Sequence, residues 1–137
     1  MRGYRMILEK RLLQVAVAIA AAVPVATGLY GVLRGPGFLN VAEPWPVDLD
    51  SHFRFYSGIF LAIGVGWYSC IPAIETKGRL FRMLAVFTFV GGLARLWSLF
   101  ATGMPSTGHM AGLCMELVGV PLLVVWQSRI ARIMRAA

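Results

Sequence analysis

The segment LLQVAVAIAAAVPVATGLYGVL, residues 12–33, decides the fold class, because it is long and apolar enough to cross a membrane as a single helix. A helix needs about 20 apolar residues to span the hydrocarbon core of a bilayer. Three further apolar runs of similar length follow, at Phe55–Ile74, Met83–Thr102 and Met110–Gln127. None shows the period-two alternation of a membrane β-barrel strand, so all four runs are expected to be helices.

The composition agrees with a chain that lies almost wholly in a membrane. Of 137 residues, 58% are hydrophobic, and the mean hydropathy is +0.73, well above the usage of a soluble domain. We predict an all-α membrane protein with a single integral membrane domain over residues 1–137. Its helices are expected at residues 12–33, 53–74, 80–102 and 109–131, with an outer loop at 34–51.

The basic residues predict the orientation of these helices. The net charge of +7 would suggest nucleic acid in a soluble protein, but here most basic residues lie at helix ends, where they set topology and meet anionic lipid headgroups. They gather in the N-terminal segment, the second gap and the C-terminal tail: Arg2, Arg5, Lys10, Arg11; Lys77, Arg79, Arg82; Arg129, Arg132, Arg135. We therefore expect an antiparallel four-helix bundle with both termini in the cytoplasm and no nucleic-acid partner.

The N-terminal region also resembles a secretory signal peptide, with a basic start, an apolar stretch and small residues at 22–26. The apolar run nevertheless continues to Leu33, so we expect the first helix to be retained. Two prolines lie inside the predicted spans. Pro24 removes the donor for the Ala20 carbonyl and Pro121 the donor for the Leu117 carbonyl, and each is expected to kink its helix.

Two intramembrane charges lie at matched depth on consecutive predicted helices. Arg95 and Glu116 each lie about six residues inside the outer helix end, roughly 9 Å below the boundary at 1.5 Å per residue. An unpaired charge there costs at least about 2.5 kcal/mol. We predict an Arg95–Glu116 salt bridge inside the bundle, with Arg54 as a possible second guanidinium. Its role is either to fix helix register or to line a small polar pocket on the outer side.

Small and polar residues recur around both charges at three- and four-residue spacing. These positions are Thr88, Gly91, Gly92, Ser98 and Thr102 on the third helix and His109, Gly112 and Gly119 on the fourth. Small residues let membrane helices approach closely, so these stripes are expected to face protein.

A second polar constellation, Asp50-Ser-His-Phe-Arg54, lies at the start of the second predicted helix. Asp50 or Ser51 is a candidate helix cap. His52 titrates near neutral pH when unperturbed, which leaves open either interfacial anchoring or a role in proton handling or ligand contact.

No cofactor is expected from the residues present. His52 and His109 both lie at outer helix ends, but no ligand spacing supports haem, chlorophyll or a divalent metal there. The two cysteines, Cys70 and Cys114, form no Cys-x-x-Cys motif and are expected to lie too far apart to form a disulfide.

Several segments resemble a bacterial family of small four-helix membrane proteins that is catalogued as a domain of unknown function. The distinctive segments are Asp50-Ser-His-Phe-Arg and Gly91-Gly-Leu-Ala-Arg, supported by Cys70-Ile-Pro-Ala-Ile-Glu and Phe81-Arg. The resemblance spans nearly the whole chain. It implies the fold and a multi-pass location in the bacterial inner membrane, and it implies no activity.

Three functions remain open from the sequence. The first is a non-catalytic membrane component, which contacts lipids and is either a subunit of a larger inner-membrane complex or a homo-oligomer. The second is a binder or transporter of a small anionic or amphipathic ligand in an outer pocket around Arg54, Arg95 and Glu116. The third is an integral-membrane enzyme that uses His52, Asp50 or Glu116 as acid–base groups on a lipophilic substrate.

Overall fold

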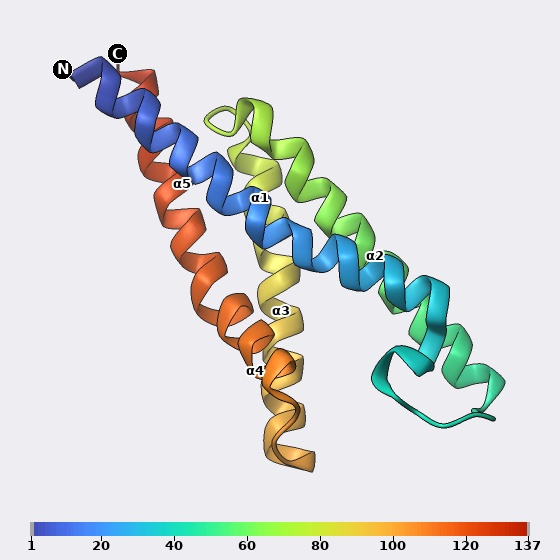
Figure 1. Cartoon of the computed structure of the whole chain (residues 1–137). Helices are drawn as coiled ribbons and strands as arrows, with labels where there is room; N and C mark the ends of the chain where they lie inside the picture. Colours follow the sequence, from blue (N-terminus) through green and yellow to red (C-terminus); the bar gives the residue numbers. More distant parts are fainter. Residues whose placement is uncertain (1, 137) are drawn as a thin grey trace. The chain divides into compact units, whose positions relative to one another are not determined.

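The computed structural model describes residues 2–136, and every regular element in that range is helical. Figure 1 shows these elements in chain order. They are α1 (Arg2–Arg34), the 3₁₀ helix η1 (Gly35–Leu39), α2 (Val47–Cys70), the 3₁₀ helix η2 (Ile71–Ala73), α3 (Gly78–Thr102), α4 (Thr107–Cys114), the π-helical η3 (Met115–Gly119) and α5 (Val120–Arg135).

Four helical stretches are long and apolar enough to cross a membrane: Gly3–Leu39, Val47–Ala73, Gly78–Thr102 and Thr107–Arg135. Two helices start earlier than the sequence predicted. Helix α1 begins at Arg2 rather than near residue 12, because most residues of its charged first turns, namely Arg, Met, Leu, Glu and Lys, are good helix formers. Helix α2 begins at Val47, so the irregular part of the connection between α1 and α2 is shorter than the expected loop at 34–51.

The chain divides into two compact units, and each is described by itself. Unit 1 comprises residues 1–15 and 72–137, and unit 2 comprises residues 16–71. Helix α1 contributes to both, because Val15 belongs to unit 1 and Ala16 to unit 2.

Unit 2 is held together by close approach of α1 and α2 at glycines. A Cβ added at Gly28 would lie 2.6 Å from the backbone nitrogen of Leu61, and one added at Gly64 would lie 2.9 Å from the backbone nitrogen of Val25. Contacts this short between backbones exclude any side chain. Gly28 and Gly64 are therefore required for the packing of this helix pair.

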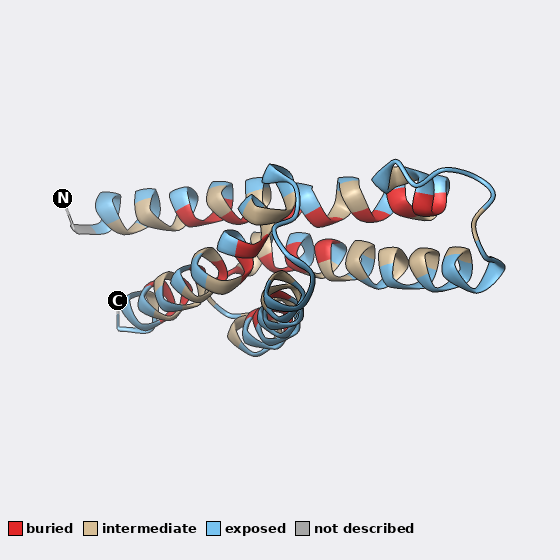
Figure 2. Ribbon diagram, turned by 90° about the horizontal axis from the view of Figure 1, so that it is seen from below, coloured by how far each residue is buried: buried red, intermediate tan, exposed pale blue. Residues whose placement is uncertain are grey.

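Unit 1 is built on α3, which packs along η3 and α5 (Figure 1). Buried positions form narrow stripes on the helices and leave most of their surfaces exposed (Figure 2). The side chains of Leu13, Ile74, Phe81 and Ile130 are fully buried. A buried side-chain amide adds a polar link, because Nε2 of Gln127 donates to the Ile74 carbonyl at 2.8 Å.

The two prolines have different outcomes. Helix α1 continues without interruption through Pro24. Shortly before Pro121, the five residues Met115–Gly119 form a π-helix, and the amide of the next residue, Val120, donates to the Met115 carbonyl five residues back. A π-turn of this kind is a known local adjustment in membrane helices, where it can accommodate a proline that has no amide to donate. The helix therefore has a wider turn before Pro121, and the kink expected there stays a prediction.

Candidate functional site: two arginine–carboxylate clusters and a basic cleft

Arg54 is the centre of a polar cluster at the C-terminal end of α1, which we call the Arg54 cluster. Its Nε and Nη2 donate to the two carboxylate oxygens of Asp50 at 2.7 and 3.1 Å. Its Nη1 donates to the backbone carbonyls of Val32 and Leu33. Trp45 completes the cluster by donating from Nε1 to Asp50 at 3.1 Å. All three guanidinium nitrogens are therefore engaged within unit 2.

The chain conformation explains why this cluster forms. The last carbonyls of α1 have no partners within the helix and carry the negative end of its dipole, so a guanidinium is favoured there. Gly35 follows α1 with φ of +58°, and a Cβ at this position would lie 2.5 Å from Oδ1 of Asp50. Only glycine allows both the left-handed turn and the close approach of Asp50.

The expectation that Asp50 or Ser51 caps α2 is wrong. The N-cap is Pro46, without a side-chain hydrogen bond, and Asp50 lies in the first turn of the helix. Asp50 instead receives hydrogen bonds from Arg54 and Trp45. His52 is exposed, with its ring edge-on to Tyr56 at 5.7 Å between ring centroids.

The predicted ion pair between Arg95 and Glu116 is present in unit 1. The Nε of Arg95 lies 3.1 Å from Oε2 of Glu116, and the two side chains are 37% and 9% exposed. The N–H is poorly aligned, however, and Oε2 has no hydrogen bond of good geometry among the described residues. Glu116 therefore has a nearby counter-charge while its hydrogen-bonding capacity is incompletely used.

The position of Glu116 follows from the packing of η3 on α3. A Cβ at Gly92 would lie 2.9 Å from Cβ of Glu116 and 2.8 Å from Cδ2 of Leu117, so Gly92 admits the π-helix as the stripe predicted. Within unit 1, by contrast, Gly91 and Gly112 have no neighbouring atom within 4 Å of an added Cβ. The expectation that the whole stripe packs on protein thus holds at Gly92 and fails within this unit at the other two.

The remaining predicted site residue, His109, lies in the first turn of α4, where its Nδ1 is 2.8 Å from Oγ of Ser106. Asp50, His52 and Arg54 belong to unit 2, whereas Arg95, His109 and Glu116 belong to unit 1. Among residues 2–136, no group of three or more His, Cys, Asp or Glu side chains is arranged to hold a metal ion. Cys70 and Cys114 do not form a disulfide.

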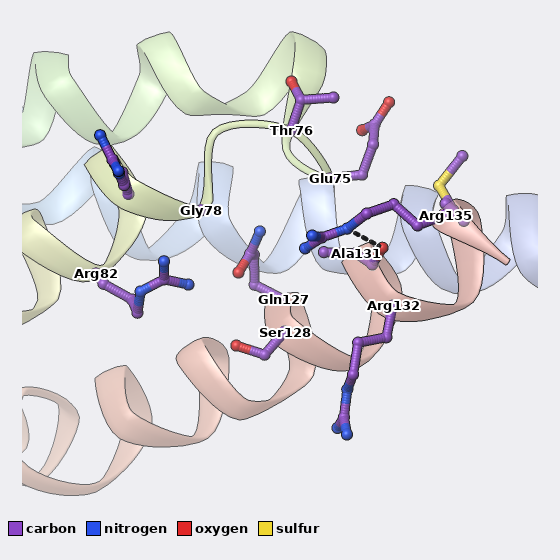
Figure 3. A pocket seen from close by; sticks show the side chains of 11 residues that line it. Glu75, Thr76, Gly78, Arg82, Gln127, Ser128, Ala131, Arg132 and Arg135 are labelled. Carbon is purple, nitrogen blue, oxygen red and sulfur yellow. Dashed lines mark hydrogen bonds between the residues drawn. The ribbon is translucent and has the colours of Figure 1, made fainter.

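Unit 1 also contains a cleft of about 790 Å³ that the sequence did not predict, and we call it the basic cleft. Figure 3 shows its lining. Four arginines line it, namely Arg79, Arg82, Arg132 and Arg135, together with Glu75, Gln127 and Ser128. The available signal was Gln127, a polar residue at the end of an apolar run, beside basic residues that we assigned to topology and to general contact with lipid headgroups.

Glu75 lies at one edge of the basic cleft, and its pKa is shifted. Burial raises the pKa of Glu75, but the hydrogen bond from Lys10 and its own backbone amide outweigh this effect, so the pKa lies below its usual value. The Lys10 ammonium lies 2.9 Å from Oε1 of Glu75, and each side chain is 20% exposed. The positive charge of Lys10 thus neutralises Glu75, the one carboxylate in the cleft lining.

These features are those of a multi-pass helical membrane protein, with four potential spans and an intramembrane ion pair. The chain belongs to the family described as "Domain of unknown function (DUF4345)", whose model matches residues 12–127. Neither the curated proteins nor the solved structures contain a significant match to it.

Proposed function

We propose that the protein is a non-catalytic component of a bacterial inner-membrane assembly, either as a homo-oligomer or as a subunit beside other membrane proteins. The observation that carries this proposal is the Arg54 cluster. Arg54 donates four of its five N–H groups to Asp50 and to α1 carbonyls, so this arginine joins two helices and uses most of its donors within unit 2. One of the polar groups singled out in the sequence thus acts mainly within the chain.

The surfaces available for association lie on the spans themselves. Large apolar side chains are exposed along all four of them, Val86 and Phe100 on α3 among these. Helix α4 carries Gly108 and Gly112 four residues apart, and within unit 1 no atom lies within 4 Å of a Cβ added to either. This small-xxx-small spacing is typical of helix pairs in membranes.

Co-purification tests the association. Two differently tagged copies of the full chain, expressed together, are expected to purify together in mild detergent. The double substitution Gly108→Leu with Gly112→Leu is expected to reduce that association, while Gly3→Leu, at another glycine with open surroundings, leaves it unchanged. A monomeric wild-type chain that purifies without any protein in stoichiometric amount contradicts the proposal.

The membrane arrangement proposed with this function is an antiparallel four-helix bundle with both termini in the cytoplasm. The asymmetry of Lys and Arg between the connections supports it, because basic residues are retained on the cytoplasmic side. Reporter fusions after Arg135 and at Pro46 are expected to report opposite sides of the inner membrane. The same side for both fusions contradicts the four-span topology.

The ligand-binding and enzymatic hypotheses have less support. Four of the five N–H groups of Arg54 are already bonded within unit 2, which leaves it one donor for an anion. An acid–base enzyme would use His52, Asp50 or Glu116, but the exposed His52 contacts Tyr56 and the Asp50 carboxylate is engaged by Arg54. Hydrolytic or proton-transfer activity that disappears in His52→Ala would favour the enzyme over the structural component.

A further inference from the structure

The basic cleft lies where potential spans begin and end. One span ends at Ala73, the next begins at Gly78, and the last ends at Arg135, and the cleft is lined by residues around these three points. Ends of membrane-spanning helices lie at the level of the lipid headgroups. The inference below rests on the proposed membrane placement, but not on the proposed association with other proteins.

The cleft concentrates positive charge, because four arginines and one glutamate line it. Figure 3 shows the guanidinium groups of Arg82 and Arg135 directed toward Gln127 from opposite sides, while that of Arg132 points away. Neither Arg82 nor Arg135 lies within ion-pair distance of a described carboxylate. The Nε of Arg135 donates to the Ala131 carbonyl at 3.2 Å, which holds its guanidinium group along the cleft.

The cleft also holds acceptor atoms without donors. The Oε1 of Gln127 and Oε2 of Glu75 are buried and have no hydrogen-bond partner among the described residues. Buried polar atoms in native proteins are almost always paired, so these two call for a donor. A fully deprotonated anion such as sulfate has no proton to offer them, whereas a ligand that combines an anionic group with hydroxyl groups satisfies both sets of side chains.

We propose that the basic cleft binds the headgroup of an anionic phospholipid, a phosphate ester that carries free hydroxyl groups. The phosphate lies between Arg82 and Arg135, because guanidinium groups bind phosphate oxygens bidentately. The headgroup hydroxyls donate to Oε1 of Gln127 and Oε2 of Glu75. Gly78 makes room for the arrangement, since an added Cβ would lie 3.2 Å from Nη1 of Arg82 and 3.4 Å from Nε2 of Gln127. Basic pockets between membrane helices are established headgroup sites in other proteins.

Native mass spectrometry of the full chain in mild detergent tests the proposal, with phosphatidylglycerol as the probe and phosphatidylcholine as the zwitterionic reference. Wild type is expected to retain phosphatidylglycerol preferentially, and less of it as salt rises. The double substitution Arg82→Gln with Arg135→Gln is expected to weaken retention about 30-fold, from the loss of two charges beside an anionic headgroup. Arg129→Gln is the matched control, since Arg129 lies on α5, pairs with Glu9 and does not line the cleft.

The possible outcomes distinguish a lipid from a soluble ligand, and they also test the proposed contacts of the headgroup. Equal retention of phosphatidylglycerol by wild type and the double variant overturns the proposal, as does wild type that does not distinguish it from phosphatidylcholine. Displacement by millimolar glycerol 3-phosphate overturns the lipid source and assigns the site to a soluble phosphate ester. Equal retention of phosphatidylethanol, an anionic phosphate diester with no headgroup hydroxyl, overturns the contacts to Gln127 and Glu75. Arg82→Lys with Arg135→Lys is expected to restore part of the binding, which distinguishes lost charge from a misfolded variant.

The co-purification of tagged copies measures association between chains independently of lipid binding. A cleft that does not bind phosphatidylglycerol therefore leaves the proposed assembly intact.

Discussion

The Arg54 cluster and the Arg95–Glu116 pair have the same chemistry, a guanidinium group beside a carboxylate, but they use it differently. Arg54 makes two aligned hydrogen bonds to Asp50 and two more to helix-end carbonyls. Arg95 lies 3.1 Å from Glu116, yet the carboxylate oxygen it approaches lacks an aligned hydrogen bond. An arginine at a helix end reaches free carbonyls, whereas one inside a span meets only what a neighbouring helix presents.

The largest effect is expected at the pair inside the span. Glu116→Ala leaves Arg95 without its counter-charge and is expected to lower the free energy of unfolding by about 3 kcal/mol, as for other truncated buried pairs. Unfolding in mixed detergent micelles measures it. The double substitution Arg95→Leu with Glu116→Leu is expected to recover much of the loss. A double variant as unstable as the two single losses added together would show that the residues are not energetic partners.

The Arg54 cluster is expected to contribute less to the free energy of unfolding, but lysine is not expected to replace its arginine. Arg54→Ala removes donors from Asp50 and from the Val32 and Leu33 carbonyls, and is expected to lower the free energy of unfolding by less than Glu116→Ala does, because the side chain is 41% exposed. Arg54→Lys restores the charge but not the fork of donors, so it is expected to recover less than half. Full recovery by lysine would mean that charge alone holds α1 to α2. The same unfolding assay distinguishes these results.

Two adjacent glycines of α3, Gly91 and Gly92, test the packing around the Arg95–Glu116 pair. A methyl group at Gly92 would press on Cβ of Glu116, so Gly92→Ala is expected to destabilise the protein by about 1.5 kcal/mol. Gly91 has open surroundings within unit 1, so Gly91→Ala is expected to stabilise α3 by about 0.5 kcal/mol through its helix propensity. Thermal unfolding of both variants measures the difference. Equal effects would contradict the close packing of η3 on α3.

The smallest effect concerns the Lys10–Glu75 ion pair. Because the folded-state pKa of Glu75 is lowered, its contribution to stability is complete above the ordinary glutamate pKa and is lost as pH falls through the folded value. Glu75→Gln is expected to cost about 1 kcal/mol at neutral pH and nothing once wild-type Glu75 is protonated. Unfolding measured from pH 7 downward tests this convergence. A constant difference between the two proteins across that range would exclude titration of Glu75 as its cause.

Much of the helix content and one ion pair were predictable from local information. Arg95 and Glu116 were paired correctly because a charge in hydrocarbon needs a partner, and the spacing of the two apolar runs leaves only one at matched depth. Capping by Asp50 was predicted wrongly, because local information does not fix where the helix starts. The sequence shows that Asp50 can cap a helix, but the helix starts at Val47, and the guanidinium of Arg54 lies one turn further along the same face.

By itself, the sequence determined that this is a helical membrane protein with four potential spans, because length and apolar composition alone decide whether a segment can cross a bilayer. Only the tertiary structure decided what the polar residues do. It directs Arg54 to the end of α1, widens the helix before Pro121 into a π-turn, and turns Arg82 and Arg135 toward Gln127 in one cleft. The physical reason is that hydrophobic burial follows from composition. Hydrogen bonds and ion pairs require positions and directions that residues far apart in the chain supply together.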